Sequence, residues 1–267
     1  NCFYGKFSNV RNYLFKEFGP DFVERFFPSI GWHRLRISKP KNLFYVPKLQ
    51  GRHEIDLNYD LLEAFFNKPI RRSYDTWVPD YAKKTESVLN HFNVSKNNYL
   101  CFQVSAANGN PTPKVWDYNN FINLFEQLRI LHSEMEIVIV GDQGDYNAYI
   151  KNIEWPEYVI QTASKTELSD LICLINNARC VVAHDSGIMH IANALGIAMI
   201  ALYGPTNYTR TKPMGKNTEI IFSQNEAFAC MYNGKIGEKE AHNKYGEFYA
   251  MSGISINSVL KRIQHIL

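Results

Sequence analysis

The segment 185–190, Asp-Ser-Gly-Ile-Met-His, has the residue types and spacing of an anion-binding site. It follows a short apolar run and begins a stretch with helical periodicity. The first backbone N–H groups of a helix have no partner inside the helix and lie at the positive end of its dipole, so they can hold a pyrophosphate without a metal. Asp185 or Ser186 can cap this end, and Gly187 lets a ligand approach the backbone. His190 can share a helix face with Ser186. The alternative is an ordinary capped helix with a hydrogen-bonded histidine.

These residues can form a site only if they lie at the edge of a sheet, and the pattern from Asn98 onward predicts such a sheet. Short apolar runs alternate with stretches of helical periodicity. Such units predict a doubly wound parallel sheet with right-handed crossovers, in which ligands bind at the carboxyl ends of the strands. A capping-box pattern, Ser164-x-x-Glu167, introduces one of the helices. The expected strands are 99–104, 136–140, 180–183 and 198–202, and the expected helices are 119–131, 145–153 and 167–176.

The first ninety or so residues have a different pattern. A stripe of phenylalanines between 15 and 26 has helical spacing and is typical of a packed core, with a membrane-docking face as the alternative. The stretch 33–53 is basic and lacks acidic residues, so it could meet anionic sugars or membrane phosphates, or be a solvated loop. A helix is expected over 56–66, and 71–85 is expected to be an interdomain linker.

The segment 181–206 resembles the hallmark of the family 9 glycosyltransferases, the bacterial lipopolysaccharide heptosyltransferases. That hallmark is D-(S/T)-G-x-x-H-(I/L)-x-x-A-L, followed by a strand and (Y/F)-G-P-T. Upstream, 113–116 (Pro-Lys-Val-Trp) resembles the family's K-x-W phosphate loop, and 165–168 (Lys-Thr-Glu-Leu) resembles its K-(T/M)-S-L turn. The resemblance spans roughly residues 28 to 267. The positions that match the hallmark are Asp185, Ser186, Gly187, His190, Ile191, Ala194, Leu195, Tyr203, Gly204, Pro205 and Thr206.

The resemblance implies the GT-B fold, in which two Rossmann-like domains face each other across a cleft. Residues 1–88 would be the remainder of the N-terminal acceptor-side domain and a linker, and 89–267 the C-terminal nucleotide-sugar donor-binding domain. In the family, the first domain opens with a strand and a G-D loop that carries the catalytic aspartate. That opening is not found in this sequence. We therefore expect an N-terminally incomplete chain, either a fragment or a naturally short member, with the catalytic base upstream of Asn1.

The loop after the first strand is expected to contact phosphate. Ser105 begins this loop and Lys114 ends it. The hydroxyl and backbone N–H groups can reach phosphate oxygens, and the ammonium can neutralise a leaving diphosphate, although a surface lysine is the alternative. A carboxylate beside phosphates is repulsive, so we assign Asp185 to capping or to a sugar hydroxyl. His184 lies outside the family hallmark and is expected to be a packing residue or one that supports the residues around the ligand. Tyr203 and Thr206 come at the end of the following strand and can border the cleft.

Two further loops are expected to hold the nucleoside. The family usually has a glutamate for the ribose hydroxyls after the second strand, and the matching residue here is Gln143. An amide can hydrogen-bond a diol without the charge assistance of a carboxylate, so the contact is weaker or passes to Asp142. Thr166 and Lys165 match the region where the family holds adenine largely through its backbone. The predicted donor-binding residues are Ser105, Lys114, Gln143, Thr166, Asp185, Ser186, Gly187 and His190.

The composition excludes several classes of protein. The 267 residues are 45% hydrophobic, enough for one large or two small packed domains. There is no apolar run of about 18 residues and no signal-peptide pattern, so we expect a cytoplasmic protein. The five cysteines form no C-x-x-C pair, which predicts reduced core residues and no metal site. A net charge of +3 without aromatic-interleaved basic motifs argues against nucleic acid binding.

The leading hypothesis is a glycosyltransferase that moves a heptose or related sugar from an ADP-activated donor to a lipopolysaccharide core acceptor, with inversion and without a cofactor. Heptose and ADP come from the resemblance alone. Peripheral contact with the inner membrane surface is a further expectation. The alternative is a non-catalytic nucleotide-sugar-binding or interaction module, which Gln143 and the missing G-D loop favour. An NAD-dependent dehydrogenase is opposed by the absence of G-x-G-x-x-G.

Overall fold

The structure is a computed structural model that describes residues 52–106, 113–231 and 234–267. The chain divides into two compact units, and the unit made of Lys48–Asp60 and Pro69–Leu267 contains the sheet and all predicted donor-binding residues. Residues 61–68, which include the end of helix α3 (Glu54–Phe66), belong to the other unit. The phenylalanine stripe and most of the basic stretch lie outside the described residues. The domain boundary between residues 88 and 89 stays a prediction.

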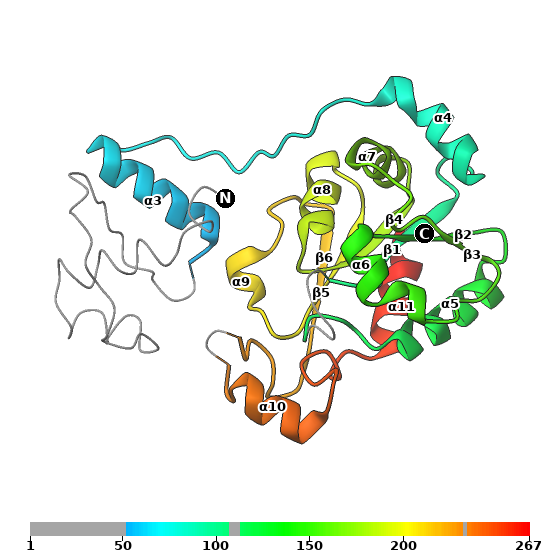
Figure 1. Cartoon of the computed structure of the whole chain (residues 1–267). Helices are drawn as coiled ribbons and strands as arrows, with labels where there is room; N and C mark the ends of the chain where they lie inside the picture. The colour runs from blue at the N-terminus through cyan, green and yellow to red at the C-terminus, as the bar shows by residue number, and fades with distance from the viewer. Residues whose placement is uncertain (1–51, 107–112, 232–233) are drawn as a thin grey trace. The chain divides into compact units, whose positions relative to one another are not determined.

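The described residues form a sheet of six parallel strands in the order β3-β2-β1-β4-β5-β6 (Figure 1). The order reverses between β1 and β4, where Cys101 pairs with Val138 on one side and Val181 on the other. This is the switch point at which doubly wound sheets bind ligands. The strands are β1 (Tyr99–Gln103), β2 (Glu136–Val140), β3 (Val159–Gln161), β4 (Cys180–His184), β5 (Met199–Tyr203) and β6 (Thr218–Phe222).

Helices cover both faces of this sheet because successive strand side chains point to opposite faces. In β1, Leu100 and Phe102 pack toward α5 (Tyr118–Leu131) and α11 (Ile256–Ile266). Tyr99 and Cys101 pack toward α4, α7 and α8. Figure 1 shows the same two layers. The bounds of these and the shorter helices are α4 (Ala82–Phe92), α6 (Gln143–Ala148), η2 (Ile150–Asn152), α7 (Leu168–Asn176), α8 (Gly187–Leu195), α9 (Tyr208–Thr211) and α10 (Glu238–Tyr245).

Several element predictions need correction. The capping box at Ser164 is wrong, because Ser164 has a left-handed φ of 66° and the N-cap of α7 is Glu167, three residues beyond the predicted cap. Instead, the backbone N–H of Glu167 donates to Asp170 Oδ2 at 3.0 Å. The expected linker over 71–85 ends early, since α4 begins at Ala82 and buries Val88. Strands β3 and β6 and helix α10 were not predicted.

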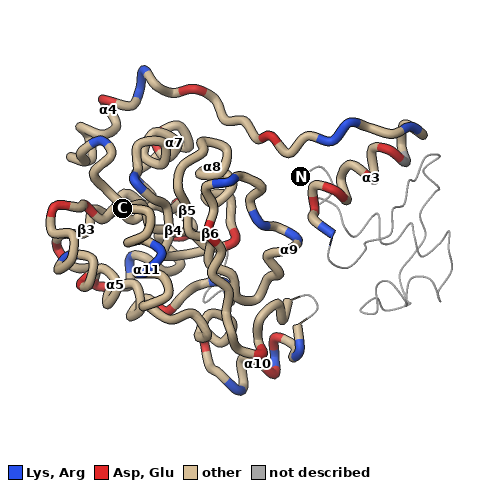
Figure 2. The backbone as a smooth tube through the Cα atoms, turned by 180° about the vertical axis from the view of Figure 1, so that it is seen from behind, with Lys and Arg blue, Asp and Glu red and all other residues tan. Residues whose placement is uncertain are grey.

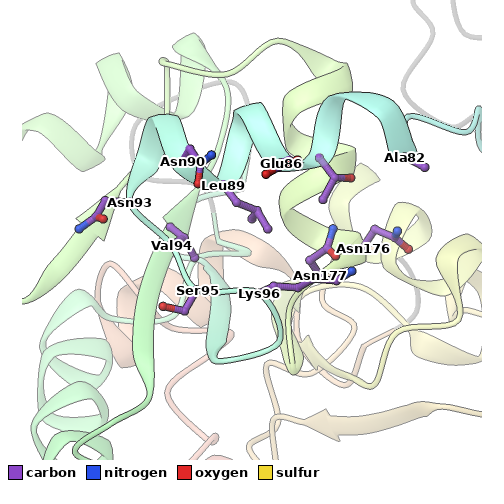
Figure 3. Close-up of a pocket in the computed structure, with 11 residues that line it drawn as sticks. Ala82, Glu86, Leu89, Asn90, Asn93, Val94, Ser95, Lys96, Asn176 and Asn177 are labelled. Carbon is purple, nitrogen blue, oxygen red and sulfur yellow. The ribbon is translucent and has the colours of Figure 1, made fainter.

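A cavity of about 710 Å³ lies between α4, the turn 93–96 and the end of α7 (Figure 3). Its polar lining includes Asn90, Ser95 and Asn177. The turn 93–96 precedes β1 and Asn177 precedes β4, so this cavity lies at the amino-terminal edge of the sheet. Ligands of doubly wound sheets bind at the opposite edge. The cavity is therefore separate from the predicted site.

Candidate functional site

The predicted site residues follow four adjacent strands. Ser105 and Lys114 come after β1, Gln143 after β2, Thr166 after β3, and the segment 185–190 after β4. Because β3, β2, β1 and β4 are parallel neighbours, their carboxyl ends share one edge of the sheet. The structure therefore brings these loops to the same side. Their roles in binding stay predictions.

Lys114 and Asp185 meet across the switch point. The Lys114 ammonium donates to the backbone carbonyl of Asp185 at 3.1 Å and lies 3.5 Å from Asp185 Oδ2. The Lys114 side chain is 30% exposed and that of Asp185 is 10% exposed. A half-buried cation therefore lies at the end of β4, beside the N-terminus of α8. An anion at this edge would meet a positive charge that the Asp185 carboxylate only partly offsets.

The N-terminus of α8 has no side-chain cap. Ser186 occupies the N-cap position, yet its hydroxyl donates to Gln103 Oε1 at 2.6 Å instead of capping the first turn. The prediction that Asp185 or Ser186 caps this helix is therefore wrong. Gln103 is the last residue of β1 and is buried, so the bond joins the ends of β1 and β4. The first-turn N–H groups of α8 therefore have no side-chain acceptor. They are available to bind an anion.

The fold does not require a glycine at position 187. A Cβ built on Gly187 would meet no atom within 4 Å, whereas one on Gly204 would lie 2.7 Å from the carbonyl oxygen of Ala250. Nor does Gly187 have the positive φ that favours glycine. Its missing side chain therefore keeps space open next to the first turn of α8, and the close approach of a ligand at this point stays a prediction.

We expect Gly187→Ala to leave the melting temperature unchanged or slightly raised, because alanine favours helix over glycine by up to about 1 kcal/mol. The matched variant Gly204→Ala should lower it by about 2–10 °C, since overpacking costs about 1–3 kcal/mol. Differential scanning calorimetry measures both. Equal losses of stability in the two variants would contradict the reading of Gly187 as a ligand-facing position.

The two loops that are expected to hold the nucleoside differ in whether their side chains are already hydrogen-bonded. The Asp142 carboxylate accepts from the backbone N–H of Asp145 at 2.8 Å and so caps α6. Gln143, the next residue, is exposed. This favours Gln143 over Asp142 for a ribose contact. Thr166 is half-buried in the loop between β3 and α7.

The strand after α8 is buried more deeply than expected. Tyr203 and Thr206 were expected to border the cleft, but they are 0% and 1% exposed. The Tyr203 hydroxyl donates to Met189 Sδ at 3.3 Å inside the core. The expectation is wrong for both residues. Tyr203 is buried because β5 lies between β4 and β6 in the sheet interior, and Thr206 is buried in the turn that follows this strand. His190 remains accessible on α8.

Two interior residues hold this edge together. His184 is fully buried, which confirms the packing prediction, and its Nε2 accepts from the backbone N–H of Trp116 at 3.1 Å. Burial lowers the pKa of His184 to about 3. Gln103 was missed as a member of the site. Its only sequence signal is a polar residue near the end of an otherwise apolar strand.

Basic and acidic positions are interspersed in Figure 2. No group of three His, Cys, Asp or Glu residues within the described ranges could hold a metal ion. Among the same residues, no helix is both long and apolar enough to cross a bilayer.

The chain is similar to several known glycosyltransferases. The chain is similar to lipopolysaccharide heptosyltransferase 2 of Escherichia coli K12, 28% identical over 142 residues, which are 47% of this chain and 40% of that protein. It resembles a solved family 9 glycosyl transferase from Veillonella parvula at a TM-score of 0.62 and 18% identity, covering 80% of this chain and 60% of that one. It also resembles E. coli heptosyltransferase WaaC with ADP at a TM-score of 0.53 and 18% identity, covering 82% and 58%.

The chain spans between 40% and 60% of the length of these relatives. The structural likenesses concern the fold, and they confirm the predicted α/β class with a Rossmann-like doubly wound sheet of the GT-B type. The model of the family described as glycosyltransferase family 9 (heptosyltransferase) matches residues 28–240, which is most of the sequence. The chain therefore belongs to glycosyltransferase family 9, the heptosyltransferase family.

Proposed function

We propose that this protein is a glycosyltransferase that moves a heptose or a related sugar from an ADP-activated donor to a lipopolysaccharide core acceptor, with inversion at the anomeric carbon. The observation that carries the proposal is the half-buried Lys114 ammonium beside the uncapped N-terminus of α8, in a chain of this family. The solved relative WaaC, which binds ADP, supports the choice of nucleotide.

In this proposal the acceptor hydroxyl attacks the anomeric carbon, and a base takes its proton. The bond from that carbon to the diphosphate oxygen breaks, and ADP departs. Lys114 and the first turn of α8 stabilise the charge on the departing diphosphate. Gln143 contacts the ribose, and the backbone around Thr166 holds the adenine. No resident cofactor takes part, and the base is not assigned.

Two points of the proposal concern the cellular setting. The acceptor is a lipopolysaccharide core, in line with the name of the E. coli relative. Because such an acceptor is membrane-anchored, we place the protein in the cytoplasm, in peripheral contact with the inner membrane surface.

A second candidate is a nucleotide-sugar-binding module without turnover. The exposed amide of Gln143, in place of the family's glutamate, favours it, because an amide binds a diol without charge assistance. In this candidate the site at the ends of β1 and β4 binds the donor, and no sugar is transferred.

The test combines calorimetry with ADP and ADP-heptose and a transfer assay with a heptose-deficient lipopolysaccharide core, followed by mass spectrometry. Binding with transfer supports the glycosyltransferase, and binding without transfer supports the module. Absence of ADP binding would contradict both. Gly187→Ala is the matched variant: it adds a methyl group to open space beside α8, so it should weaken ADP binding while the fold stays intact.

A further inference from the structure

His184 is a buried histidine to which the proposed function gives no role. It is the last residue of β4 and has no exposed surface. Its ring meets Phe121 edge-on, with ring centroids 5.8 Å apart. A polar ring in the interior costs free energy unless it finds hydrogen-bond partners, so the partner of Nε2 indicates what the ring does.

The His184 ring acts as a neutral hydrogen-bond acceptor. Its Nε2 accepts from the Trp116 backbone N–H, which requires a lone pair on Nε2 and places the ring proton on Nδ1. Burial lowers the pKa of His184 to about 3; the backbone of Ser105 opposes this shift and the charge of Lys114 adds to it. The ring therefore remains neutral over the whole range around pH 7.

The hydrogen bond holds the main chain two residues from Lys114. The Trp116 side chain is fixed by other contacts. Its Nε1 donates to the Ile254 carbonyl at 3.1 Å, and the centroid of its ring lies 5.0 Å from the centroid of the Phe121 ring. His184 therefore acts on the backbone N–H of Trp116 and not on its indole. The hydrogen bond therefore fixes the position of the backbone two residues after Lys114.

We propose that His184 is a positioning residue that holds the Trp116 backbone so that the Lys114 ammonium stays at the end of β4, ready for the donor diphosphate. The inference rests on the proposed function and adds a residue to its site. Since His184 and Asp185 are consecutive, one strand end holds the segment 113–116 at two points. One is the backbone of Trp116 and the other is the ammonium of Lys114, 3.1 Å from the Asp185 carbonyl. The imidazole itself transfers no proton.

Two substitutions separate the hydrogen bond from burial. His184→Gln places an acceptor oxygen near the position of Nε2, whereas His184→Leu fills the space without an acceptor. A buried N–H left without a partner costs about 1–3 kcal/mol, which the loop can relieve by moving away from β4. We expect ADP binding, measured by calorimetry, to weaken about tenfold in His184→Leu and to stay within about threefold in His184→Gln. Equal affinities in the two variants would overturn the role.

A double-mutant cycle with Lys114→Ala tests whether His184 acts through Lys114. We expect His184→Leu to change ADP affinity by less than about twofold once Lys114 is alanine, because coupled residues are not additive. The same tenfold loss in both backgrounds would overturn the inference. If His184→Leu does not fold, His184→Asn replaces it, since its shorter amide does not reach the Nε2 position. Absence of ADP binding in the unaltered protein would overturn the proposed function itself, and with it this role.

Discussion

Lys114→Ala is expected to weaken ADP binding by about ten- to hundredfold, because a charge-assisted hydrogen bond contributes about 1.5–3 kcal/mol. The Lys114 ammonium is only partly exposed, and the Asp185 carbonyl at 3.1 Å holds it at the edge where the diphosphate is proposed to lie. The fold should be unaffected, since one partly exposed ion pair contributes little to stability. Calorimetry with ADP and a thermal melt measure the two effects.

Two control variants make this result specific. Lys261→Ala removes the same charge from an exposed position on α11 and should leave ADP affinity unchanged. Lys114→Arg keeps the charge but changes the shape of the donor group, so its affinity should fall between those of the unaltered protein and Lys114→Ala. If Lys114→Ala and Lys261→Ala bind ADP equally well, Lys114 is not part of a diphosphate site.

Asp185 has a cationic contact that the sequence did not predict. The sequence alone favours capping or a sugar hydroxyl as the role of Asp185, because a carboxylate next to a phosphate is repulsive. The structure places the Lys114 ammonium 3.5 Å from Asp185 Oδ2, so the carboxylate has a cationic neighbour. This contact joins residues 71 positions apart, and no local pattern reports it.

The central strands were predictable and the edge strands were not. β1 and β4 are buried along their whole length, and each begins with four consecutive apolar residues. β3 is three half-buried residues at one edge of the sheet, and β6 at the other edge begins with Thr218 and Glu219. Edge strands face solvent, and this removes the apolar signal on which the prediction depends.

The position of the site followed from the sequence, but its hydrogen bonds did not. Once the strands are parallel, their carboxyl ends must share an edge, and this places Lys114 near Asp185. The choice of Gln103 as the partner of Ser186 depends on the register of β4 against β1, in which Leu100 lies opposite Cys180. Helix N-cap preferences describe local backbone and do not contain this information.

Trp116→Ala is expected to cause the largest loss of stability, about 3–5 kcal/mol, because it empties a fully buried site. It also removes the donor to the Ile254 carbonyl and the edge contact with Phe121. For a domain of this size the melting temperature should fall by about 6–20 °C, which calorimetry would show. Trp77→Ala is the matched control: Trp77 is 82% exposed, so its loss should change the melting temperature by less than about 2 °C. Similar melting temperatures for the two variants would contradict the placement of Trp116 in the core, and with it the anchor of the segment that carries Lys114.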